Sequence, residues 1–272
     1  MYLFLGRQLS TQSSLVNEVE TFDIGSYAYK KMMMQIDDTN MNKIEENSLK
    51  DSILETLLSY EVHVGLSKKD VHQNMVKYIR GYRNNLAIYD INILLQIYRI
   101  MFYSLSLSAS EGPILFITKN KFLNYKIQQL ARKYDHYYMT GKWINGFLTN
   151  FHEMKTNIMN VYGTKLKRRK RVLFNTLGIS SMGTLPSMIV LIGLQGNRVM
   201  LREANQMRIP VIGFSSAREN GKNLWQCIPS NLNSEKSLYF YYYLLKIAIE
   251  KGHELKKSNL VKENESVQKD KS

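Results

Sequence analysis

The sequence predicts an α/β protein built on a doubly wound parallel sheet. Three short, continuous apolar runs have the length and composition of strands buried on both faces: GPILFI (112–117), LPSMIVLIG (185–193) and IPVIGF (209–214). Helical patterns alternate with these runs, at 91–110, 124–135, 196–207 and 237–252. Because parallel strands need crossover helices between them, this alternation predicts one α/β domain over about 49–252.

The remaining segments are assigned by composition and periodicity. Residues 1–48 are polar with scattered Met and Tyr, which indicates an extension of low order. LAIYD (86–90) is a short strand that we place in the same domain. The segment 150–177 stays helical and polar, and so predicts a helical excursion from the sheet. Residues 253–272 form a charged tail without apolar periodicity, so the closing helix is expected to end at 252.

Composition favours a polyanionic partner. The 272 residues include 37 Lys and Arg against 23 Asp and Glu, a formal net charge of +14. Such an excess favours nucleic acid first and an anionic membrane surface second. No apolar run reaches the roughly 20 residues of a membrane span. The basic run KLKRRKR (165–171) has Leu166 as its only apolar residue, so it lacks a face that could insert into a membrane.

Signals for catalysis and metal binding are weak. The five histidines show no metal-ligand spacing, and a single cysteine, Cys227, excludes an internal disulfide. We therefore predict no catalytic residue, no metal site and no cofactor. Glu203 is interpreted as a helix cap or an ion-pair partner rather than an acid catalyst.

One loop leaves an enzymatic alternative open. VLIGLQGN (190–197) runs from a strand through Gly193 and Gly196 into a helix, which is how some α/β proteins hold phosphates. The motif lacks a third glycine, so a tight turn is the favoured interpretation. The alternative is an enzyme that binds a nucleotide or phosphosugar at Gly193–Asn197.

Basic, amide and aromatic residues cluster at several places, which favours RNA binding. Cations meet phosphates, amides meet base or sugar edges, and aromatic rings stack on bases. The predicted RNA-binding residues are Asn74, Lys77, Tyr78, Arg80, Arg83, Lys119, Lys121, Lys142, Asn145, Lys165, Lys167, Arg168 and Arg169.

The segments 75–91, 142–151, 177–193 and 227–238 resemble, in this order, segments of the bacterial-type ribosomal protein S2 family of the small subunit. KWINGFLTNF (142–151) resembles its tryptophan signature, and MVKYIRGYRNNLAIYDI (75–91) resembles an earlier family segment. LGISSMGTLPSMIVLIG (177–193) and CIPSNLNSEKSL (227–238) resemble two later ones. The resemblance covers about 49–250 and implies a flavodoxin-like domain with a protruding helical hairpin, here shortened, at 150–177.

The resemblance also implies a role and a place. It implies a structural, non-enzymatic constituent of the small ribosomal subunit that takes part in translation. Its partners would be small-subunit rRNA and neighbouring ribosomal proteins near the head–body junction, with mRNA nearby and neither a membrane nor a small-molecule substrate. Lys142, Asn145 and Gly193 depart from the family pattern. Together with the N-terminal extension, these departures favour a mitochondrial form in the matrix over a plastid or free-living bacterial one.

Structural roles are expected for a second set of residues. Trp143 and Phe147 should pack beneath the signature loop while Lys142 and Asn145 face RNA, and Thr149 or Asn150 should cap the following helix. The full set comprises Trp143, Phe147, Asn150, Pro186, Gly193, Pro210 and Pro229.

Overall fold

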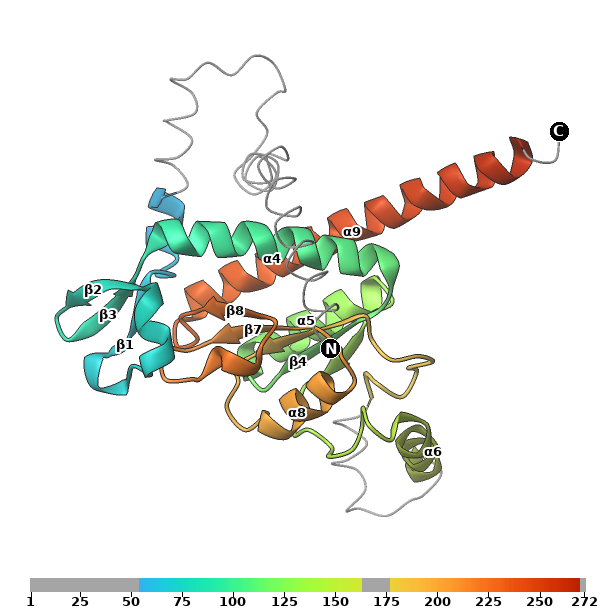
Figure 1. The fold of residues 1–272 in the computed structure, drawn as a ribbon, viewed down its shortest axis with the longest axis horizontal. Helices are drawn as coiled ribbons and strands as arrows, with labels where there is room; N and C mark the ends of the chain where they lie inside the picture. The colour runs from blue at the N-terminus through green and yellow to red at the C-terminus, as the bar shows by residue number, and fades with distance from the viewer. Residues whose placement is uncertain (1–53, 163–176, 270–272) are drawn as a thin grey trace, which may run out of the picture.

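The computed structural model describes residues 54–162 and 177–269. Within these ranges the chain forms two sheets, with helices on both faces of the larger one (Figure 1). The predicted helical excursion is represented by α6 (Phe151–Tyr162). The rest of the predicted hairpin, including the basic run 165–171, lies outside the described residues.

The larger sheet has five parallel strands in the order β5-β4-β6-β7-β8. This is the strand order of flavodoxin-like, doubly wound folds, and it confirms the predicted fold class. Each strand is short, and β4, β6 and β7 are buried along their whole length. The strands are β4 (Ile114–Thr118), β5 (Tyr137–Met139), β6 (Met188–Ile192), β7 (Val211–Ser215) and β8 (Gln226–Pro229).

The continuous apolar runs reflect burial of both faces of this sheet. In β6, Val190 and Ile192 pack with the helices of one face, while Ile189 and Leu191 pack with the other face. The first face is covered by α4 (Ile91–Glu111), α5 (Lys121–Lys133) and α9 (Glu235–Lys269), and the second by α8 (Arg198–Gln206) and the loop 143–151. Successive side chains of a strand point to opposite faces, so neither face could be polar.

Helix α9 is longer than the sequence predicts. It continues past residue 252 to Lys269 and runs out beyond the body of the molecule in Figure 1. The prediction that the helix ends at 252 is therefore wrong. Apolar periodicity reports burial rather than helicity, and 253–269 contain neither glycine nor proline to stop the helix. At the crossing of α9 with α4, a Cβ on Gly252 would lie 2.5 Å from the Ser106 carbonyl oxygen, so glycine permits the close approach.

A second, smaller sheet was not predicted. It is antiparallel with the order β1-β3-β2, formed by β1 (Val64–Ser67), β2 (Ile79–Arg83) and β3 (Leu86–Tyr89). The predicted strand at 86–90 therefore exists, but it belongs to this sheet and not to the parallel one. Asn84 and Asn85 both have positive φ, at 50° and 63°, and they form the two-residue turn of the β2–β3 hairpin. Asparagine tolerates this left-handed conformation, which explains the Asn-Asn pair.

A buried histidine gives the fold a pH dependence. Burial, and secondarily the charge of Lys256, lower the pKa of His136 from its ordinary value of 6.5 to about 4. Its Nδ1 accepts a hydrogen bond from the Ile114 amide at 3.4 Å, at the start of β4. The folded protein therefore keeps this imidazole neutral where the unfolded chain protonates it.

Because the unfolded state binds more protons between pH 6.5 and about 4, the free energy of unfolding should fall as the pH falls through this window. The contribution of His136 is full above pH 6.5, and its loss amounts to about 3 kcal/mol at about 1.36 kcal/mol per pKa unit. Urea unfolding at pH 7 and pH 4 measures it. A His136→Asn variant should show a pH dependence smaller by that amount, and an unchanged dependence would contradict the assignment.

Candidate nucleic-acid interface

The signature loop 142–150 is held by a buried carboxylate. Glu203, on α8, is 5% exposed and accepts three hydrogen bonds from the loop. Its Oε1 accepts from Trp143 Nε1 at 3.1 Å and from the Gly146 amide at 2.7 Å, and its Oε2 accepts from the Leu148 amide at 3.1 Å. Carboxylate acceptors make stronger hydrogen bonds than neutral ones, so one side chain fixes three points of the loop.

The expectation that Glu203 is a cap or an ion-pair partner is therefore wrong. Its partners are neutral N–H groups of a loop 55 to 60 residues earlier in the chain. Two rings complete the support: Trp143 is 5% exposed and meets Phe147 edge-on, with centroids 5.7 Å apart. Lys142 and Asn145, on the same loop, are exposed. The arrangement buries the aromatic residues and leaves the polar ones on the surface.

The remaining residues with expected structural roles lie at element ends. Asn150 is exposed, precedes α6, and its amide donates to the Gly146 carbonyl at 2.9 Å. Gly193 follows β6 with φ 85°, a conformation that favours glycine. Pro186 is buried before β6, Pro210 is half-buried before β7, and Pro229 is buried at the end of β8.

Three predicted cations gather at the carboxyl end of β4. Lys119 directly follows this strand, and Lys121 begins α5. Burial lowers the pKa of Lys119, and the charge of Lys142 lowers it further, so the two ammonium groups face a common region. Lys119 Nζ donates to the Gln195 carbonyl at 3.2 Å. Closely spaced cations of this kind favour an anionic partner because they repel one another without it.

The antiparallel sheet and the 3-10 helix just before β2 (Gln73–Tyr78) carry a second basic group. Lys77, Arg80 and Arg83 are all exposed, and we call these three residues the hairpin cluster. The half-buried Tyr78 ring lies under the Lys77 ammonium at 4.8 Å. Asn74, also predicted to meet RNA, donates from Nδ2 to Asn220 Oδ1 at 2.8 Å. This hydrogen bond therefore links the segment before β2 to the loop after β7.

Folding adds cations that the sequence prediction missed. Lys68 and Lys69 are exposed on a short 3-10 helix (Lys68–Asp70) after β1. The Lys68 ammonium lies 5.2 Å from the centre of the Tyr82 ring on β2. These lysines come near β2 only when the sheet folds, because β1 pairs with β3 and β3 pairs with β2. The predicted residues Lys165, Lys167, Arg168 and Arg169 lie outside the described residues.

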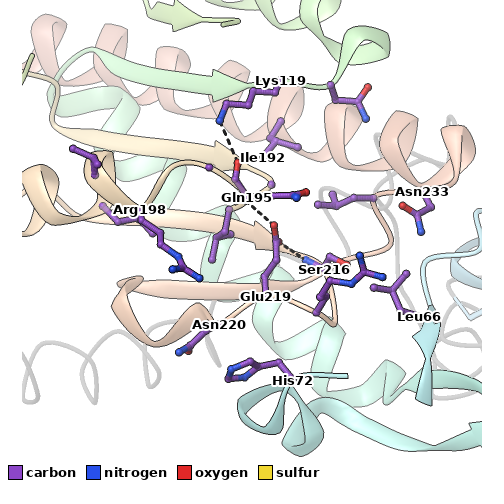
Figure 2. A pocket seen from close by; sticks show the side chains of 18 residues that line it. Leu66, His72, Lys119, Ile192, Gln195, Arg198, Ser216, Glu219, Asn220 and Asn233 are labelled. Atoms are coloured by element: carbon purple, nitrogen blue, oxygen red, sulfur yellow. Dashed lines mark hydrogen bonds between the residues drawn. The ribbon is translucent and has the colours of Figure 1, made fainter. Parts of the chain in front are cut away.

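An open cavity of about 1020 Å³ lies at the carboxyl ends of the parallel strands, and Lys119 is among the residues that line it. Figure 2 shows Lys119 on one side of it and His72 on the other. The loops after β4 and β6 line it, at the point where the strand order reverses. This is where open α/β sheets commonly bind ligands.

Glu219 accepts hydrogen bonds from two backbone N–H groups that line this cavity. Its Oε1 accepts from the Gln195 amide at 2.7 Å, and its Oε2 accepts from the Ser216 amide at 2.8 Å (Figure 2). An oxyanion of the protein thus sits where the loop after β6 would hold a phosphate. This arrangement argues against the nucleotide- or phosphosugar-binding alternative at Gly193–Asn197.

The described part of the chain contains neither a candidate metal cluster nor a candidate membrane span. Over 54–162 and 177–269, no group of three or more His, Cys, Asp or Glu side chains could hold a metal ion. None of the helices described there combines the length and apolarity that a bilayer crossing requires.

A family model for ribosomal protein S2 matches residues 57–252. The chain belongs to the ribosomal protein S2 family. The S2 match includes both sheets, the signature loop with Glu203, the hairpin cluster and the cavity. The resemblance of the quoted segments is thereby confirmed over nearly the whole range where it was expected.

Three similar S2 proteins bear the name small ribosomal subunit protein uS2. The protein from a Nitratiruptor species is 27% identical over 227 residues, covering 76% of this chain and 85% of that protein. The protein from Malacoplasma penetrans is 23% identical over 296 residues, covering 95% and 79%. The protein from Buchnera aphidicola subsp. Cinara cedri is 24% identical over 233 residues, covering 78% and 97%.

Proposed function

We propose that this S2-family chain is a structural constituent of the small ribosomal subunit and takes part in translation. The observation that carries the proposal is the family match over 57–252, and the three similar proteins bear the name of a small-subunit component. Its partners are small-subunit rRNA and neighbouring ribosomal proteins. The net charge of +14 supports an RNA partner.

The proposed mechanism is placement rather than catalysis. Lys119, at the carboxyl end of β4, lines the cavity. The hairpin cluster begins three residues after Asn74, which is hydrogen-bonded to Asn220 in the cavity lining. Cationic side chains bind phosphates and fix register without reading base sequence. Glu203 supports this role indirectly, because it holds the loop that presents Lys142 and Asn145.

The finer location is also a proposal. We place the chain in the mitochondrial matrix, in the mitochondrial small subunit, near the head–body junction and the path of exiting mRNA. In support, the three bacterial relatives are only 23–27% identical to it, and Lys142, Asn145 and Gly193 depart from the family pattern. Fractionation of cells with antibody detection tests this: the chain should be enriched with matrix markers, and recovery in another fraction contradicts it.

The RNA-binding part predicts a salt dependence. If the protein neutralises about six phosphates, the logarithm of its affinity for small-subunit rRNA should fall with the logarithm of salt concentration at a slope of roughly −4 to −5. Filter binding between about 50 and about 300 mM KCl measures the slope. A slope near zero would contradict RNA binding, whereas a steep slope alone would not distinguish specific from non-specific contacts, so a tRNA competitor serves as the control.

A further inference from the structure

Helix α5 carries an unusual charge pattern. Its 13 residues (KFLNYKIQQLARK) contain four cations, Lys121, Lys126, Arg132 and Lys133, and no carboxylate. Surface helices of soluble proteins commonly mix both signs and gain stability from pairs of opposite charge three or four residues apart. Within α5 such pairs are impossible, so its charges point to a partner outside the helix.

The outward side of α5 is a single polar stripe. Lys121, Tyr125, Gln129 and Arg132 follow one another at helical spacing, and we call these four residues the α5 stripe. The opposite side is buried in the sheet core through Leu123, Ile127, Leu130 and Ala131. The stripe therefore faces away from the protein along most of the length of the helix.

Tyr125 is the central residue of the stripe. It is 67% exposed, more than any other large hydrophobic residue in the described part of the chain. Gln129, one helical turn later, donates from Nε2 to the Tyr125 hydroxyl at 2.9 Å. This hydrogen bond restrains the ring. Arg132 is exposed at the far end, where its Nη2 donates to the Tyr138 hydroxyl at 2.6 Å. A restrained, exposed ring between two cations can stack on a base while the cations hold the adjoining phosphates.

The neighbouring side of α5 is already satisfied within the protein. The Lys126 ammonium lies over the rings of Tyr239 and Tyr242 of α9, at 4.6 and 5.5 Å from their centres. Lys133 forms an ion pair with Glu250 at 3.8 Å. These contacts hold α5 against α9. Arg132 of the stripe also lies over a ring, 5.4 Å from the centre of Tyr138, but its side chain stays exposed, so the α5 stripe is the more open side of the helix.

The α5 stripe is continuous with the candidate interface. Lys121 is two residues from Lys119, which faces Lys142 across the carboxyl end of β4. A strand of RNA bound at that edge could therefore continue along α5. An A-form duplex offers no unstacked base to Tyr125, so the composition favours a single-stranded segment.

We propose that the α5 stripe binds a single-stranded segment of RNA, with Tyr125 stacking on an unpaired base and Lys121 and Arg132 contacting phosphates on either side of it. This proposal rests on the proposed function and adds a contact surface to it. A protein partner is disfavoured because Tyr125 is the stripe's only large apolar group, whereas the core of a protein interface is depleted in charge.

The test compares full-length variants by filter binding to small-subunit rRNA. The double variant Lys121→Gln and Arg132→Gln should weaken binding about 5- to 30-fold and reduce the salt slope by nearly 2. The matched control is Arg202→Gln with Lys257→Gln, which removes two exposed cations elsewhere and should change affinity less than about twofold. Tyr125→Leu should weaken binding about fivefold or more, while Tyr125→Phe keeps the ring and should retain affinity.

The outcomes separate this proposal from the proposed function. If the α5 double variant behaves like its control while charge reversal of the hairpin cluster abolishes binding, the α5 proposal is overturned and RNA binding stands. If neither affects binding and the wild type shows no salt slope, RNA binding itself fails. If the α5 variants bind RNA normally but no longer enter the subunit, the stripe contacts a protein, which also overturns the proposal. Far-UV circular dichroism confirms that each variant is folded.

Discussion

Replacing Glu203 by alanine should lower the free energy of unfolding by about 3–5 kcal/mol, because it leaves three buried or half-buried N–H groups without an acceptor. A buried N–H group without an acceptor costs more free energy than its hydrogen bond contributed, because water does not take the place of the lost carboxylate oxygen. Urea unfolding measures the change. Loosening of the loop should also raise the exposure of Trp143, which is visible as a red shift of its fluorescence.

Variants close to Glu203 separate the hydrogen bonds from the packing. Glu203→Gln keeps the volume but leaves only one acceptor oxygen, so it should cost about half as much as alanine. Trp143→Phe removes a single donor and should cost about 1–2 kcal/mol. Glu111→Ala, at the exposed end of α4, is the matched control and should change stability by less than about 0.5 kcal/mol. A Glu203→Ala variant as stable as this control would refute the role assigned to the carboxylate.

Reversing the charges of the hairpin cluster should weaken binding to small-subunit rRNA by about 100-fold or more at about 0.1 M salt. Each of the changes Lys77→Glu, Arg80→Glu and Arg83→Glu removes a phosphate contact and places a carboxylate beside the remaining phosphates. All three side chains are exposed, so the fold should persist. Filter binding at several salt concentrations should show a slope shallower by about 2 to 3.

The matched control reverses three exposed cations away from the hairpin. Arg202→Glu, on α8, and Lys256→Glu and Lys257→Glu, on the end of α9, alter the net charge by the same amount. If binding depends on position, this control should lose less than about tenfold. Equal losses in both triple variants would show that only net charge matters and would remove the hairpin cluster from the interface.

The parallel sheet could be predicted because its central strands are buried on both faces. β4, β6 and β7 are continuous apolar runs, a pattern typical of parallel strands that are covered on both faces. β5 and β8, at the two edges, have only three and four residues and include half-buried positions, so their sequences carry no such signal. The β1–β3 pairing joins segments through long-range contacts that periodicity does not report.

The candidate site was predictable where the signal was local. Lys142, Trp143 and Asn145 stand together in one segment, and the signature draws attention to them. The carboxylate that organises this segment, Glu203, lies on another helix and is adjacent only after folding. The α5 stripe escaped prediction for a different reason: Lys121 stands out in the sequence as a single cation, whereas the stripe depends on which side of the folded helix is exposed.

The most direct test of the central claim is sedimentation. Lysate of cells that make this protein should be run on sucrose gradients with and without magnesium chelation, and this chain followed by mass spectrometry. We expect the chain to co-migrate with the small ribosomal subunit in magnesium and to leave that position when the subunit falls apart on chelation. A chain that stays at the top of the gradient as free protein, while other small-subunit proteins sediment normally, would contradict its assignment as a constituent of the subunit.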